Sequence, residues 1–179
     1  MNMRYFVTVV LFIASMTGAK AKNNISVDYT EESELVSVIA HLAKVPGYIW
    51  PEEQAGVIDY FHQVDSTFAP YSNHPIMAFV ADSLVKQGFG YHVPVAMALR
   101  LKLKNGKLHY NTDLEPDFNH YYRGITPRHE KKLIALLEDF YKKAHFHSFF
   151  KKNLPLYNAC KQAMQQQLVN KIDLAWYKS

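Results

Sequence analysis

The segment from Thr126 to Ala144 constrains the fold more than any other part of the chain. Its apolar residues recur at spacings of three and four, which places them along one face of an α-helix. Thr126 offers an N-cap hydroxyl, and Pro127 suits the first helical turn. A helix with one apolar face has to cover that face with other elements. The apolar positions are Leu133, Leu136, Leu137, Phe140, Tyr141 and Ala144.

Other segments show the same helical signals, so the sequence predicts an all-α single domain of five to six helices. From Glu31 onward, Leu35, Val38, Ile39 and Leu42 form one apolar stripe. Pro46-Gly47 is expected to end that helix. The other expected helix starts are Pro51, Pro75, the region of Pro94, Pro127 and a point after Asn153.

The region between residues 100 and 127 is the least helical part of the chain. Asn105-Gly106 is a strong two-residue turn signal, which allows one small β-hairpin near 100–110. The alternative is that the helix begun near Pro94 runs on through this segment. Residues 110–127 are polar and aromatic, and we expect a long loop that is packed by its own rings or lines a site.

The first residues have the layout of a secretory signal peptide. Arg4 gives a short positive start, Tyr5 to Met16 is apolar, and small residues precede an expected cleavage after Ala21. A membrane anchor is the weaker alternative, since spanning a bilayer takes about 20 apolar residues. We therefore expect 1–21 to be removed and 22–179 to be exported to the periplasm or outside the cell. No membrane span is expected after cleavage.

Charge argues against a nucleic-acid partner. The formal charge of +4 falls to +2 when the expected signal peptide takes Arg4 and Lys20 with it. Lysines and arginines look scattered along the sequence, and the doublets Lys142-Lys143 and Lys151-Lys152 fit a solvated helix face. The one cysteine, Cys160, cannot form an internal disulfide and is expected to be a buried or half-buried structural thiol.

The pair His129-Glu130 resembles the start of the zinc-protease pattern H-E-x-x-H. That pattern needs a second histidine four residues on, but Leu133 stands there and belongs to the apolar stripe. We expect His129 and Glu130 to be polar residues of a capped first turn, with Glu130 favourable at the positive end of the helix.

Two groups of residues are weak candidates for a metal or catalytic site. His145 and His147 would point to different sides of a helix and share a metal only on extended backbone. The second group lies in the aromatic loop and has no calcium-loop pattern; it comprises His109, Asp113, Glu115, Asp117 and His120. The sequence specifies no catalytic residue, cofactor or metal ligand, and we expect none.

Four segments together resemble the N-terminal half of an exported bacterial family called domain of unknown function 4932. The segments are "SELVSVIAHLAKVPGY", "NHPIMAFVADSLVKQGFGYHVPVAMALRLK", "LLEDFYKKAHFHSFFKKNLPLY" and "KIDLAWYKS". The family is metallopeptidase-like, and its H-E-x-x-H helix follows the segment that "IDLAWYKS" begins. The resemblance therefore implies that this chain ends at Ser179 before the zinc helix, and no residue here inherits a zinc role.

Three functions remain open at this level. The first is a non-catalytic exported helical domain that packs against a missing catalytic half or binds a peptide or envelope protein. The second is a small hydrolase or metal-binding protein that uses the 109–120 loop. The third is a truncated fragment without a function, whose apolar faces would be partly uncovered.

Overall fold

The computed structural model describes residues 26–49, 58–111 and 125–171, and within them the chain is mostly helical with one small antiparallel sheet. The prediction of an all-α domain with a hairpin near 100–110 is confirmed. The expected signal peptide and the start of the helix at Pro51 lie outside the described residues. The elements are α1 (Glu31–Leu42), α2 (Ile58–Phe68), α3 (Pro75–Ala78), α4 (Val93–Leu99), β1 (Leu101–Lys104), β2 (Lys107–Tyr110), α5 (Pro127–Lys143) and α6 (Phe146–Gln167).

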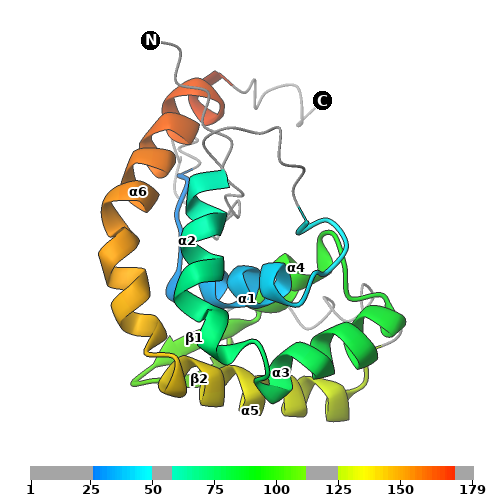
Figure 1. The fold of residues 1–179 in the computed structure, drawn as a ribbon. Coiled ribbons are helices and arrows are strands. Elements are labelled where there is room, and N and C mark those ends of the chain that lie inside the picture. Colours follow the sequence, from blue (N-terminus) through cyan, green and yellow to red (C-terminus); the bar gives the residue numbers. More distant parts are fainter. Residues whose placement is uncertain (1–25, 50–57, 112–124, 172–179) are drawn as a thin grey trace, which may run out of the picture.

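Helix α1 lies in the middle of the fold. It contacts α4, α6, α3, α5 and strand β1, and Figure 1 shows it crossing the centre of the molecule. Its first turn is capped by the Thr30 hydroxyl, which accepts from the backbone N–H of Ser33. Because neighbours surround it, α1 buries half of its 12 residues and has none in the exposed class, so its burial extends beyond one stripe.

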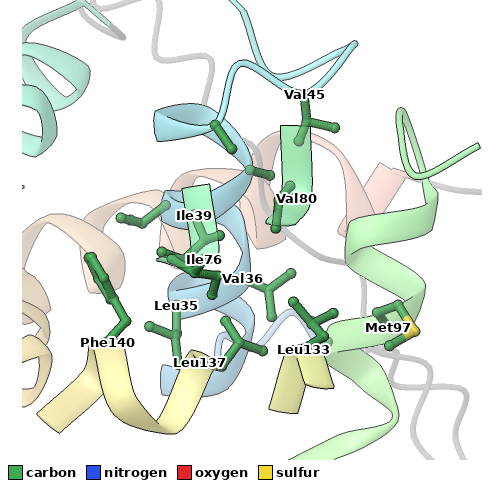
Figure 2. Packing of buried hydrophobic residues seen from close by; sticks show 14 of the residues in the cluster. Leu35, Val36, Ile39, Val45, Ile76, Val80, Met97, Leu133, Leu137 and Phe140 are labelled. Carbon is green, nitrogen blue, oxygen red and sulfur yellow. The ribbon is translucent and has the colours of Figure 1, made fainter. Parts of the chain in front are cut away.

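The core gathers side chains from α1, α3, α4 and α5 (Figure 2). Leu35 and Ile39 of α1 meet Leu137 and Phe140 of α5 there, and all four are essentially inaccessible to solvent. Burying each such side chain stabilises the fold by about 1.5–3 kcal/mol relative to leaving it exposed. Leu133 is buried in the same cluster, so the interpretation of this position as core and not as a lost zinc ligand is supported.

Aromatic rings join α2 to α5 and α6. The ring of Phe68, at the end of α2, lies 5.4 Å from that of Phe140 and 4.9 Å from that of Phe149, centroid to centroid. Phe146 stacks on the other side of Phe68, at 5.9 Å. Tilted and edge-on arrangements at these separations are favourable beyond the area that they bury. These rings pack the C-terminal end of α2 against the start of α6.

The hairpin forms as the Asn105-Gly106 turn predicts. Both turn residues have positive φ, 53° and 72°, and Leu103 pairs with Leu108 across the strands. Helix α4 therefore ends at Leu99 and does not run on into the hairpin. The backbone N–H of Leu108 donates to a carboxylate oxygen of Glu138 at 2.8 Å, which fastens the strand edge to α5.

The start of the last helix was predicted wrongly. It begins at Phe146, not after Asn153, and continues through Pro155 to Gln167. Two features permit this. His145 adopts a left-handed backbone conformation, which turns the chain sharply after α5. The side-chain amide of Asn153 donates to the backbone carbonyl of Phe149 within the helix. Pro155 lacks an N–H, but it is exposed and costs the helix only one backbone hydrogen bond.

Within the described segments, none of the helices combines the length and apolar character needed to cross a membrane.

Candidate functional site

A carboxyl group lies among tyrosines where α1, α2 and α6 meet. Glu34 of α1 accepts a short hydrogen bond from the hydroxyl of Tyr60 on α2. The Tyr60 hydroxyl also lies 2.9 Å from that of Tyr157 on α6. We call these three residues the Glu34 cluster. Within the described residues, no lysine, arginine or histidine pairs with Glu34, so its partners are neutral hydroxyls.

Burial dominates the electrostatics of the cluster. It raises the pKa of Glu34 above its ordinary value, and hydrogen bonds from Tyr60 and Tyr157 only partly offset this effect. The pKa values of Tyr60 and Tyr157 are also raised, first by burial and then by the nearby Glu34 charge. Burial therefore disfavours the charged form of Glu34 and of both phenols.

Groups around the cluster hold α6 against the N-terminal segment. The ring of Tyr29 lies 5.4 Å from that of Tyr157, and its hydroxyl donates to the side-chain oxygen of Asn158 at 2.9 Å. Cys160 is buried one turn further on, as the sequence predicts. Burial, and then the Glu34 charge, raises the pKa of its thiol, which makes it a poor nucleophile.

Two histidines join separate elements through carboxylates. His41, near the end of α1, faces Asp65 of α2 at 2.9 Å through Nε2 and the carbonyl of Tyr48 at 3.2 Å through Nδ1. Both hydrogen bonds form together only when the ring carries two protons. His74 caps α3 by accepting from the N–H of Ile76 at Nδ1, so Nε2 donates to Asp139 of α5 at 3.0 Å.

Two other acids, Glu31 of α1 and Glu130 of α5, also join separate elements through hydrogen bonds. Glu31 accepts from His147 Nδ1 at 2.9 Å and from the hydroxyl of Tyr141 at 3.0 Å. Glu130 accepts from the guanidinium of Arg100 at 2.6 Å, so it ties α5 to the end of α4 in addition to lying in the first helical turn. Both acids therefore have a structural role, which is to link neighbouring elements of the fold.

The structure does not bring the sequence-predicted candidates into one described site. His109 is exposed on β2, His145 is exposed at the junction of α5 and α6, and His147 turns to Glu31. Asp113, Glu115, Asp117 and His120 lie outside the described residues. Within the described ranges, no group of three histidine, cysteine, aspartate or glutamate side chains is placed to hold a metal ion.

The pair His129-Glu130 lies in a capped first turn, as predicted. The Thr126 hydroxyl accepts from the N–H of His129, and His129 Nδ1 accepts from the N–H of Thr126. His129 thus takes the role that Glu or Gln usually plays in a capping box.

Sequence reasoning missed the Glu34 cluster, although α1 carries a signal for it. Glu34 stands one turn before Val38, so it lies at the edge of the apolar stripe of α1. Pairing Glu34 with Tyr60 and Tyr157 requires the positions of three helices, which no single segment of the sequence contains.

Two loops meet beside α4 and present exposed apolar side chains. We call residues 44–49 and 88–92 the loop pair. The N–H of Tyr91 donates to the carbonyl of Pro46 at 2.8 Å, and a Cβ on Gly47 would lie only 3.1 Å from the Tyr91 ring. Tyr91 has a φ of 50° and is 73% exposed, and Ile49 is 62% exposed. A strained, exposed aromatic is unusual for a structural residue.

Comparison with known proteins leaves the family open. No protein-family model, no curated protein and no solved structure matches the chain, so the resemblance to the domain of unknown function 4932 stays a prediction.

Proposed function

We propose that this protein is an exported helical domain that binds an apolar segment of another protein and does not catalyse a reaction. The loop pair carries the proposal. The Tyr91 backbone is held by its hydrogen bond to Pro46, and the space beside Gly47 leaves no room for a Cβ next to the Tyr91 ring, yet most of the Tyr91 surface faces solvent. An aromatic side chain that is ordered before binding loses little entropy when a partner covers it, which is the usual property of an interface hot spot.

The rest of the molecule supports a self-contained binding domain. In the described part of the chain, large hydrophobic side chains are strongly exposed at only four positions, and two of them belong to the loop pair. The other two are Tyr110, whose hydroxyl donates to Glu130, and Leu168. The alternative of a fragment with uncovered apolar faces is thereby less favoured.

A site-specific cross-linking experiment tests the binding proposal. A photoreactive phenylalanine analogue replaces Tyr91 in exporting cells, and the same analogue at Tyr110, the exposed tyrosine of the hairpin, serves as the matched control. We expect a discrete adduct from position 91 only, mapped to an apolar segment of one exported protein. A synthetic peptide of that segment should bind the purified chain, and Tyr91→Ala should weaken this binding at least about tenfold. Equal labelling at both positions, or no effect of Tyr91→Ala, contradicts the proposal.

Two further measurements test the other parts of the proposal. Export predicts that the protein recovered from outside the cytoplasm has an intact mass that corresponds to residues 22–179. The absence of catalysis predicts that a peptide library remains uncleaved with and without added zinc. Zinc-dependent hydrolysis by the purified chain would overturn the non-catalytic assignment.

A further inference from the structure

Charge is divided between the two halves of the described structure. Residues 26–49 and 58–99 carry two lysines and arginines against seven aspartates and glutamates. Residues 100–111 and 125–171 carry thirteen against three. The negative charge of the first half and the positive charge of the second partly cancel in the sum. The modest net charge of the chain therefore does not reveal this division.

Each of the few acids in the described basic half has a hydrogen-bond or ion-pair partner. Glu130 binds Arg100, Glu138 accepts from the backbone of β2, and Asp139 binds His74 and Lys143. The Glu130 side chain is mostly buried, at 13% exposure, whereas the Asp139 side chain is 40% exposed. These acids are therefore paired, while most lysines and arginines of the basic half are exposed; on α5, Lys143 pairs with Asp139 at 2.8 Å and the Lys132 ammonium lies 4.6 Å from the centre of the Phe79 ring.

The exposed cations follow one side of α5 and continue onto the hairpin turn. The turn packs against α5, since a Cβ on Gly106 would lie 3.7 Å from the Tyr141 ring. Lys142 lies one turn after Glu138, the residue that holds the hairpin, so it stands next to the turn lysines. In Figure 1, α5 runs along one edge of the fold, with the hairpin at its end. We call this surface the basic face; it comprises Arg128, Lys131, Lys132, Lys142 and Lys143 of α5 with Lys104 and Lys107 of the hairpin.

The basic face differs from an ordinary protein interface. The strongly exposed large hydrophobic residues of the described structure are Ile49, Tyr91, Tyr110 and Leu168, so none lies on α5. Interface cores are depleted in lysine and enriched in aromatic residues, which is the opposite of this composition. A straight helix of 17 residues, about 25 Å long, offers a row of point charges suited to a flat array of phosphates.

We propose that the basic face binds the phosphate headgroups of an anionic lipid membrane as a peripheral, electrostatic contact. Clusters of four to eight lysines and arginines are the size that anionic bilayers attract. Since no large hydrophobic side chain of α5 is strongly exposed, the contact rests on headgroups and not on insertion between acyl chains. The contact is independent of the binding site proposed at the loop pair.

Vesicle sedimentation with the full mature chain tests the proposal. Vesicles of equal parts phosphatidylglycerol and phosphatidylcholine should bind the protein at low salt, and vesicles of phosphatidylcholine alone should not. Binding should be lost at about 0.5 M NaCl, because salt screens charges beyond a few ångströms. Equal binding to both vesicle types, or binding that survives high salt, overturns the electrostatic contact.

Charge-matched variants locate the surface. Lys131→Gln with Lys142→Gln should weaken binding to the anionic vesicles about 30-fold, since each cation near such a surface contributes roughly fivefold. Lys86→Gln with Lys171→Gln removes the same charge from exposed positions outside the basic face and should weaken binding to the anionic vesicles much less. Equal losses in both pairs overturn the assignment to α5. A duplex DNA of random sequence is the competing polyanion, and tighter binding to DNA than to the vesicles also overturns the lipid proposal.

Discussion

The hydroxyl of Tyr60 donates to the carboxylate of Glu34, and this contact joins α2 to α1 at a point where both side chains have left bulk water. Tyr157 extends the contact to α6. A carboxylate in this position is less stable than the same carboxylate in water, because burial removes its hydration. The hydrogen bonds from the hydroxyls replace that hydration only in part. The cluster therefore links three helices at a cost that depends on pH.

Glu34→Gln should stabilise the protein at neutral pH. Because burial raises the pKa of Glu34 in the folded state, its favourable contribution is present below the unfolded carboxyl pKa of about 4.5. It is lost as the pH rises through the raised folded value. We expect the variant to gain on the order of 1 kcal/mol at pH 7 and little at pH 4, as measured by urea unfolding. A gain that does not change with pH would show that ionisation of Glu34 is not its cause.

Tyr48→Phe should raise stability as well. Among the described residues, the buried Tyr48 hydroxyl has no well-formed hydrogen bond, and burial, offset only in part by the nearby Val95 backbone, raises its pKa to about 12. Removing an unsatisfied buried hydroxyl while the ring stays in place is expected to gain about 1 kcal/mol in the free energy of unfolding. The control is Tyr71→Phe, which deletes a hydroxyl that donates to the Lys143 carbonyl and should lose about 1 kcal/mol. Equal losses for both variants would contradict the expected contrast.

Gly47→Ala should cost more than Gly88→Ala. Both glycines have a φ near +86°, so both substitutions bear the same left-handed backbone strain of about 1 kcal/mol. A new Cβ at position 88 meets nothing within 4 Å, but one at position 47 lies 3.1 Å from the Tyr91 backbone and ring. We expect an extra loss of about 1–2 kcal/mol at position 47, measured by thermal unfolding. Similar losses at both positions would mean that Tyr91 moves freely, which would also weaken the argument for an ordered loop pair.

Asp139→Asn should lower the melting temperature at neutral pH and have no effect in strong acid. Lys143, and then His74, holds the pKa of Asp139 below its ordinary value. The stabilisation is therefore present above the ordinary carboxyl pKa and is lost as the pH falls through the lowered one. Thermal unfolding between about pH 7 and pH 2 measures the difference from the native protein. Asp82→Asn, at an exposed acid of the π-helical turn Phe79–Leu84, is the control and should change little.

Local sequence patterns were sufficient to predict most of the helices and the hairpin. The apolar spacing of α1 and α5, the Thr126 cap and the Asn105-Gly106 turn each depend on neighbours within a few residues, and each forms as predicted. The start of α6 was missed because Asn153 and Pro155 are local signals against a helix interior. The stacking of Phe146 and Phe149 on Phe68 stabilises the helix there, and that contact joins residues far apart in sequence.

The candidate sites required long-range information. The sequence named histidines and acids by their spacing, but His147 and Asp139 form pairs with residues more than 60 positions away. The loop pair gave no sequence signal, because the positive φ of Tyr91 and the closeness of residues 46 and 47 to Tyr91 appear only in the structure.

The sequence by itself determined the helical class, the hairpin turn and the buried face of α5, since these follow from backbone preferences and from the period of apolar residues. The tertiary structure decided which charges meet and which face solvent. Glu34 lies among tyrosines, and the acids of the basic half are bound to neighbours while its lysines remain exposed. The physical reason is that burial and ion pairing depend on distances between elements far apart in the chain, and the pattern of any one element does not contain those distances.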